Sequence, residues 1–168
     1  MKKFTAIGVS VVFVIGALAM PAVAATPYAS TALKAQLKFL VEEEKVARDV
    51  YTILAKDAAF PKFKNIARTE QFHMDQLATV LKTYGITNPN TTRKAGVYLN
   101  KDLAALYKTL VAKGELSTAD AIAVGVTIET ADLATIADVE KLITQDDIQF
   151  VINYLKAGSI NHLAAFNR

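Results

Sequence analysis

The sequence predicts an all-α protein in which four long helices form a bundle with a long connection across it. Apolar residues recur every three to four positions over long stretches, which is the spacing of helices buried along one face. Alternation of β-branched residues, which would indicate strands, is rare, and no repeat or low-complexity linker divides the chain. We therefore expect a single helical domain over residues 25–168, long enough for one substantial core.

Residues 1–24 have the three-part composition of a secretory signal peptide. Lys2 and Lys3 precede an apolar run over residues 7–19, and Ala22-Val23-Ala24 supplies the small residues that favour cleavage after Ala24. We expect a periplasmic or extracellular protein with no stable membrane span after cleavage. The alternative is a retained membrane anchor, because the apolar segment is long enough to cross a bilayer. Cleavage would leave a nearly neutral chain, whose charge does not suggest nucleic-acid binding.

The first two helices are delimited by helix-breaking residues. The first is expected over about residues 31–58, because Pro61 follows it. The second is expected over 62–84, ended by Gly85. Residues 86–99 contain several turn-forming residues and are expected to form a loop.

Two capping signals then predict a shorter helix and a third long one. Asn100 is expected to cap a helix over 101–113, which Gly114 ends. Ser117 is expected to cap a helix that starts at residue 118 and ends between 134 and 143.

The last helix is expected to start at Thr144, three residues before Asp147, and to run to Phe166 with a bend at Gly158. The four long helices, with the loop and the shorter helix between the second and the third, predict a four-helix bundle with one long crossover. That connectivity is ferritin-like.

Each long helix is expected to bury polar residues. The first helix places Glu44 on its apolar stripe, and its neighbours Glu42 and Glu43 are expected to point to solvent. The second helix places both members of Glu70-x-x-His73 on its stripe.

The last two long helices add further polar residues. Glu129 lies on the stripe of the third long helix, Asp132 lies near its edge, and His162 lies on the stripe of the last helix. The expected stripe of the third long helix consists of Ile122, Val126, Glu129, Leu133 and Ile136. Several carboxylates and both histidines of the chain would thus share one core, where they need compensating positive charge.

A bound metal is the simplest source of that charge. The chain has no cysteine, so any metal must be held by oxygen and nitrogen ligands, which suit iron, manganese or zinc. A dinuclear carboxylate site in a bundle uses a Glu on each of two helices and a Glu-x-x-His on each of the other two. Ser159 stands where the second such motif would have its Glu. Either Asp132 supplies the missing carboxylate, or the second ion is held weakly or not at all.

Two resemblances bear on this site. The segment from Glu44 through Ala47 and Arg48 to Tyr51 resembles the first-helix ligand segment of rubrerythrins, and Glu70-x-x-His73 resembles their second-helix ligands. The chain from about residue 33 to 166 resembles more closely a ferritin-like family of uncharacterised function in bacteria and archaea. The segments that carry this second resemblance are residues 42–51, 65–73, 125–132 and 158–163.

The resemblance implies a ferritin-like fold and a set of metal ligands, but no reaction. The implied ligands are Glu44, Glu70, His73, Glu129 and His162, with Asp132 in the position of a second carboxylate on the third long helix. The chain lacks the cysteine knuckle of full rubrerythrins, and Ala164 stands where the uncharacterised family usually has Arg.

The hypothesis that follows is an exported di-iron carboxylate oxidoreductase, an oxidase or peroxidase, that acts on dioxygen or peroxide. Two iron ions are the expected cofactors, with manganese or zinc as alternatives. One competing hypothesis is an iron-handling protein, a ferroxidase or sequestration protein without organic substrate. Another is a non-enzymatic helical envelope module. The sequence leaves open whether two copies pair, and it favours a partly exposed salt bridge for Arg48 and a packing role for Tyr51.

Overall fold

The computed structural model describes residues 26–56, 61–91 and 93–168, and all regular structure in these ranges is helical. The predicted signal peptide lies outside them. None of the described helices has both the length and the hydropathy that crossing a bilayer requires. The helices are α1 (Thr31–Leu54), α2 (Lys62–Thr83), α3 (Lys101–Gly114), α4 (Thr118–Glu140) and α5 (Asp146–Phe166).

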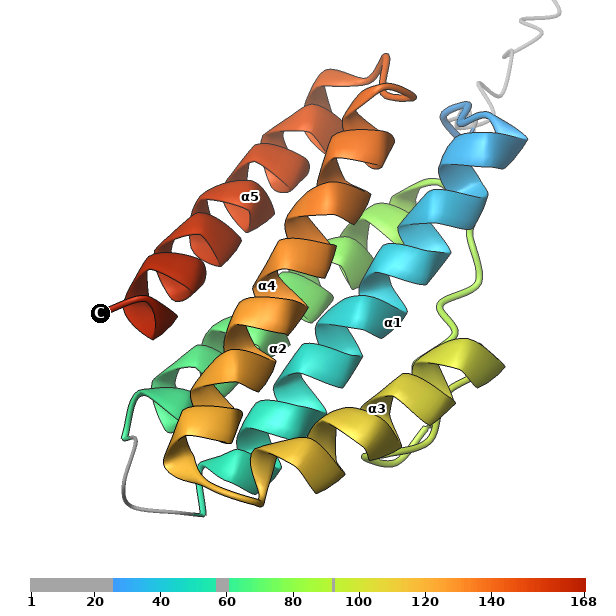
Figure 1. The fold of residues 1–168 in the computed structure, drawn as a ribbon. Helices are drawn as coiled ribbons and strands as arrows, with labels where there is room; N and C mark the ends of the chain where they lie inside the picture. The colour runs from blue at the N-terminus through green and yellow to red at the C-terminus, as the bar shows by residue number, and fades with distance from the viewer. Residues whose placement is uncertain (1–25, 57–60, 92) are drawn as a thin grey trace, which may run out of the picture.

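Four of these helices run alongside one another, and α3 lies across the outer side of α1 and α4 (Figure 1). α1 packs against α2 and α4, and α5 packs against the same two helices. The four helices therefore form a closed ring in which α2 and α4 are diagonal. The chain between α2 and α4 crosses the bundle and contains α3 (Figure 1). This arrangement is compatible with the predicted four-helix bundle and its long crossover.

Side chains cap the helices at two of the predicted positions. The N–H groups of Asp102 and Leu103 donate to Asn100 Oδ1, and the N–H of Asp120 donates to Ser117 Oγ at 3.0 Å. These bonds satisfy backbone donors that the first turn leaves without partners. The predicted starts of α3 and α4 are therefore confirmed.

The end of α2 is also confirmed. Gly85 has a φ of +62°, and the N–H of Ile86 donates to the carbonyl of Leu81 at 2.8 Å. This is the geometry in which a glycine in the left-handed region closes a helix.

Three predicted details of the helices are wrong. α1 ends at Leu54 rather than near residue 58. Gln145, not Thr144, is the N-cap residue of α5, and it makes no side-chain capping bond. α5 is unbroken through Gly158, because the glycine accommodates a close neighbour, described below, rather than a bend.

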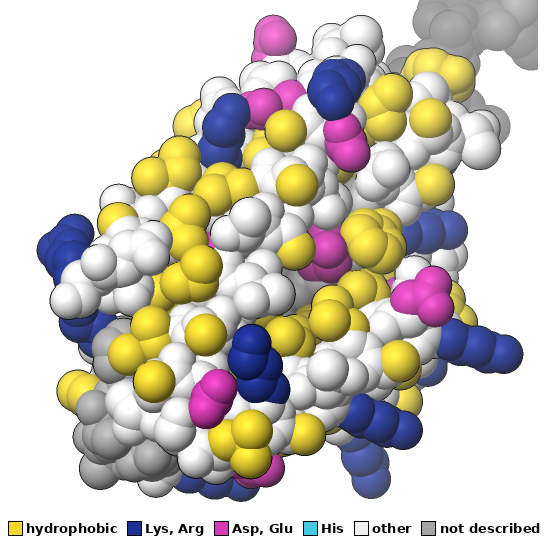
Figure 2. All heavy atoms as spheres, viewed as in Figure 1, with side chains coloured by type: hydrophobic (Ala, Val, Ile, Leu, Met, Phe, Trp, Pro, Cys, Tyr) yellow, Lys and Arg dark blue, Asp and Glu magenta, His cyan; other side chains and the backbone are white. Residues whose placement is uncertain are grey.

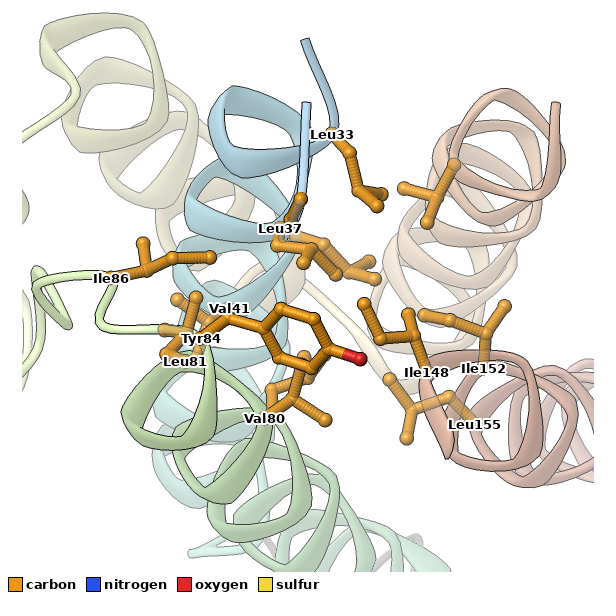
Figure 3. Packing of buried hydrophobic residues seen from close by; sticks show 14 of the residues in the cluster. Leu33, Leu37, Val41, Val80, Leu81, Tyr84, Ile86, Ile148, Ile152 and Leu155 are labelled. Carbon is orange, nitrogen blue, oxygen red and sulfur yellow. The ribbon is translucent and has the colours of Figure 1, made fainter. Parts of the chain in front are cut away.

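The apolar core consists of two clusters, one toward each end of the bundle. In the first, side chains of α1, α2 and α5 surround Tyr84 (Figure 3). In the second, the rings of Tyr51, Phe63 and Phe166 stack with centroids 5.5–5.6 Å apart. On every long helix, the buried polar residues that were predicted as ligands fall between the residues of these two clusters.

α1 is buried on a second face, which the sequence did not predict. Glu42 is only 4% exposed, and Leu99 and Asn100 donate their backbone N–H groups to its carboxylate, so its predicted solvation is wrong. Glu43 is half-buried rather than solvated. The crossover loop and α3 cover this side of α1, which leaves little of the helix to water.

Further along the same face of α1, Lys45 is 1% exposed and donates to Asp49 Oδ2 at 2.6 Å and to the carbonyl of Lys94 at 2.9 Å. The Tyr98 hydroxyl and the Gly96 N–H donate to the same carboxylate oxygen, at 2.8 and 2.9 Å. These bonds fix the crossover loop to α1. We call the residues Glu42, Lys45, Asp49 and Tyr98 the loop anchor.

Candidate metal centre

The six residues predicted as metal ligands are buried in the middle of the bundle. They come from all four long helices, and the most exposed of them, His162, is 7% exposed. We call the six the carboxylate–histidine cluster: Glu44, Glu70, His73, Glu129, Asp132 and His162.

Five of the six form two compact groups that share one residue. His73 Nδ1 lies 3.1 Å from Glu44 Oε2 and 2.9 Å from Glu70 Oε2. His162 Nδ1 lies 2.8 Å from the other Glu70 oxygen, Oε1, and 3.6 Å from Glu129 Oε2. In each group the three donor atoms lie within 4.8 Å of one another. We call these groups the His73 triad and the His162 triad; each offers two carboxylate oxygens and one imidazole nitrogen, and Glu70 belongs to both.

Several donor atoms in these triads have no hydrogen-bond partner among the described residues. Glu44 Oε1, Glu70 Oε1 and His162 Nδ1 are all buried without one. The last two lie 2.8 Å apart, but they are not aligned as donor and acceptor. Buried polar groups normally are hydrogen-bonded, so unpaired atoms that converge on one region could hold a metal ion.

The imidazoles carry the positive charge of this cluster when no cation is present. Burial by itself lowers the pKa of His73, but the Glu44 and Glu70 carboxylates outweigh it and raise that pKa to about 11. Burial likewise lowers the pKa of His162, and Glu129 and Glu70 raise it to about 9. Burial by itself raises the pKa of Glu70, but close contact with the His162 and His73 rings and their positive charges lower it to about 2. Glu70 is therefore a carboxylate held between two imidazolium rings.

The other carboxyls are shifted toward their protonated forms. Burial, reinforced by the Glu70 charge, raises the pKa of Glu129 to about 7 and that of Asp132 to about 8. Burial and the Asp132 charge also raise the pKa of Glu44. Metal binding would require the donor atoms to release these protons.

Asp132 is buried beside the triads but belongs to neither of them. Its Oδ2 accepts a 2.5 Å hydrogen bond from the hydroxyl of Ser159, and its Oδ1 is buried without a partner. Ser159 stands where the second Glu-x-x-His motif would have its Glu, and Asp132 was expected to replace that Glu. The structure shows that these two residues are hydrogen-bonded to each other. The sequence did not predict this contact, although Ser159 precedes His162 by one helical turn.

Tyr51 and Arg48 occupy different environments. The Tyr51 hydroxyl donates to Glu129 Oε1 at 2.7 Å, which leaves Oε2 directed to the His162 triad, while its ring packs in the core. Arg48 is half-buried and donates to Asp49 and to Gln71. The packing role of Tyr51 and the salt-bridge role of Arg48 are both confirmed, and Tyr51 also orients a predicted ligand.

Comparison with known proteins assigns the chain to a family. Residues 34–168 match the family described as an uncharacterized protein domain, DUF2202. The chain belongs to this family. The expectation of an uncharacterised family is thereby confirmed, whereas the relation to rubrerythrins stays a prediction.

A relative of the chain has been solved by crystallography. The uncharacterized protein MJ0754 of Methanocaldococcus jannaschii is 47% identical over 130 residues, which are 76% of this chain and 69% of the relative. The crystal structure of this hypothetical protein superposes with a TM-score of 0.80 at 41% identity and covers 83% of this chain and 80% of that one.

In this DUF2202 chain, the close approach of α5 to α2 depends on Gly158. A Cβ atom at this position would lie 2.5 Å from His73 Nε2 and 2.6 Å from Cε1, closer than atoms can approach. The glycine therefore makes room for the imidazole and fixes how far its ring can shift. The sequence predicted only a bend at Gly158. The two small residues Gly158 and Ser159, one helical turn before a buried histidine, could have indicated the close approach of another helix.

The buried face of α4 is rotated from its expected position. Ile122, Val126 and Leu133 are only partly buried, whereas Asp132, expected at the edge of the stripe, is 6% exposed. α1, α3 and α5 all pack against α4. The apolar residues of α4 therefore lie on several of its faces and do not define one stripe.

Proposed function

We propose that this protein is an exported, ferritin-like di-iron carboxylate oxidoreductase that holds one iron ion in each triad and acts on dioxygen or peroxide. The observation that carries the proposal is the position of Glu70, which presents one carboxylate oxygen to each histidine. A carboxylate shared in this way would contribute to holding both ions.

The chemistry of the donors is compatible with iron. Each triad combines carboxylate oxygens with one imidazole, a set that suits iron and also manganese or zinc. The buried oxygens Glu44 Oε1 and Glu70 Oε1 support a cation, because neither accepts a hydrogen bond from the described residues.

Two iron ions at these positions would supply the electrons that reduce dioxygen or peroxide. The protein contributes the arrangement around them. Glu70 orients both triads, Tyr51 holds the Glu129 carboxylate by its hydroxyl, and Gly158 sets the position of the His73 ring. The apolar clusters on either side keep bulk water away from the donors.

The experiment is an anaerobic titration of the metal-free protein with ferrous iron, followed by elemental analysis and thermal unfolding. We expect two ions per chain and a stabilisation of about 2.7 kcal/mol for each ion when free iron is a hundredfold above its Kd. Glu70→Gln is expected to lose both ions. The matched control is Asp75→Asn, which removes an exposed carboxylate from the same helix. A wild-type protein that retains no iron, manganese or zinc and unfolds at the same temperature with and without them contradicts the proposal.

Reaction of the reduced protein with excess peroxide or dioxygen separates the oxidoreductase from the iron-handling alternative. Repeated turnover with an added reductant is expected for the oxidoreductase. A single oxidation step, after which iron accumulates as a ferric product, would instead assign the protein to iron oxidation and storage.

A further inference from the structure

A small cavity lies between α1, α3 and α4, on the side of the bundle that α3 covers. Its volume is about 20 Å³, which is enough for one water molecule or one small cation. Two acidic side chains line it, Glu43 from α1 and Asp132 from α4, and the rest of its lining is formed by Val, Leu, Ile and Ala side chains. Figure 2 shows an acidic side chain recessed among hydrophobic ones in the hollow between α4, α1 and α3.

Both carboxyls present an unpaired oxygen. Glu43 Oε2 and Asp132 Oδ1 are buried and accept no hydrogen bond from the described residues. Such an oxygen next to an apolar wall is unfavourable unless a cation or water visits it. Asp132 is 6% exposed, and Ser159 holds its other oxygen at 2.5 Å, so the carboxyl cannot turn freely away from the cavity.

The position of these carboxyls relates the cavity to the carboxylate–histidine cluster. Glu43 directly precedes Glu44 of the His73 triad, and Asp132 lies one helical turn from Glu129 of the His162 triad. Leu106 of α3, which also lines the cavity, is 38% exposed and therefore forms its outer rim. The cavity thus has a partly exposed apolar rim on its outer side, and Asp132, which interacts electrostatically with Glu44, Glu70 and Glu129, lines it on its inner side.

We propose that this cavity is the passage through which a divalent cation reaches the buried triads, with Glu43 as the outer and Asp132 as the inner carboxylate along it. The inference rests on the proposed metal site and adds a route to it. The two carboxylates replace water ligands as the cation leaves solvent, and neither needs to remain bound to it. This explains why Asp132 is buried and held in place although it belongs to neither triad.

The test measures how fast the metal-free, full-length protein takes up cobalt(II), followed by stopped-flow absorbance of the cobalt bands. Glu43→Gln is expected to slow uptake about tenfold, because it removes the charge that attracts the cation. The final stoichiometry and the equilibrium Kd should equal those of the wild type. Leu106→Ala, which widens the rim, is expected to accelerate uptake. The control is Asp138→Asn, which removes an exposed carboxylate of α4 that pairs with Lys141 and is expected to change nothing.

The outcomes distinguish the passage from the site. Wild-type uptake rates in both Glu43→Gln and Leu106→Ala overturn the passage and leave the metal site intact. A weaker equilibrium Kd for Glu43→Gln with an unchanged uptake rate also overturns it, because Glu43 would then be a ligand. If the wild-type protein takes up no cobalt, iron, manganese or zinc at equilibrium, the proposed function itself fails.

Discussion

α1 has buried polar residues on two opposite faces, and the two groups differ in how they are satisfied. In the loop anchor, the ammonium of Lys45, both oxygens of Asp49 and the Glu42 carboxylate all have partners, several of them backbone groups of the crossover. In the carboxylate–histidine cluster, oxygens of Glu44 and Glu70 and a nitrogen of each ring have no hydrogen bond from or to any residue that the structure describes. The two groups are therefore similarly buried, but the loop anchor is fully hydrogen-bonded and the carboxylate–histidine cluster is not.

The difference suggests what each group is for. A fully paired buried network stabilises one arrangement of the chain and needs nothing further. A network with several unpaired donors and acceptors in one region is not completed by the protein itself, as is expected of a group that binds a ligand. If this interpretation holds, mutations in the loop anchor should lower stability and spare metal binding, and mutations in the triads should do the reverse.

The largest expected effect is on the loop anchor. Lys45→Met should reduce the free energy of unfolding of the metal-free protein by about 3–5 kcal/mol, because Asp49 would stay buried without its principal partner. Urea unfolding measures this loss. The double variant Lys45→Met/Asp49→Leu should recover part of it, since no unpaired charge is then left. A loss below about 1 kcal/mol in the single variant would mean that Arg48 and the hydrogen bonds from Tyr98 and Gly96 compensate Asp49 without Lys45.

A matched pair two residues apart tests the comparison most directly. Glu42→Gln should lower the free energy of unfolding by about 1.5–3 kcal/mol, because it weakens charged hydrogen bonds to the crossover backbone, and should keep both ions. Glu44→Gln should retain the stability of the metal-free protein but lose the ion of the His73 triad. Urea unfolding and metal analysis of both variants measure these outcomes. If both variants lost metal to the same extent, the two faces would not be functionally distinct.

The smallest expected effect is a dependence of stability on pH. Burial by itself raises the pKa of Asp49, but hydrogen bonds from Lys45, Gly96 and Tyr98 and the charge of Arg48 lower it below its ordinary value. The Tyr107 hydroxyl of α3 faces the same carboxylate and stays neutral, since burial and Asp49 raise its pKa.

Because the folded pKa of Asp49 is depressed, its stabilisation is fully present above the unfolded pKa of about 3.9 and is lost as pH falls through the folded value. The difference in free energy of unfolding between wild type and Asp49→Asn should accordingly be constant from pH 7 to pH 5 and shrink below about pH 4. A difference that is unchanged at pH 3 would exclude a charged Asp49 as the source of the stability.

The sequence was sufficient to predict the helices and most of the cluster. A period of three to four residues depends only on local geometry, so it placed Glu44, Glu70, His73, Glu129 and His162 on buried faces. The capping residues Asn100 and Ser117 and the helix-ending Gly85 also act locally, through hydrogen bonds and dihedral angles that the residue type favours.

Apart from the end of α1 and the start of α5, the errors concern contacts between distant segments. The burial of Glu42 depends on residues 99 and 100 of the crossover, whose position relative to α1 cannot be deduced from periodicity. Lys45 and Asp49, spaced four apart on the same face as Glu42, were a signal for that second buried face. Likewise, the role of Gly158 depends on His73 from another helix, and no local pattern contains both.

The shared carboxylate of Glu70 has a consequence for how the two ion positions respond to each other. If each triad binds an ion, the same side chain contributes to both positions, and the affinity of one position depends on whether the other is filled. Linkage makes this dependence reciprocal, so the factor by which the first ion changes the binding of the second equals the factor in the opposite direction. The two positions therefore form one thermodynamically coupled unit. A chelator should remove the two ions in two steps that have different dissociation constants.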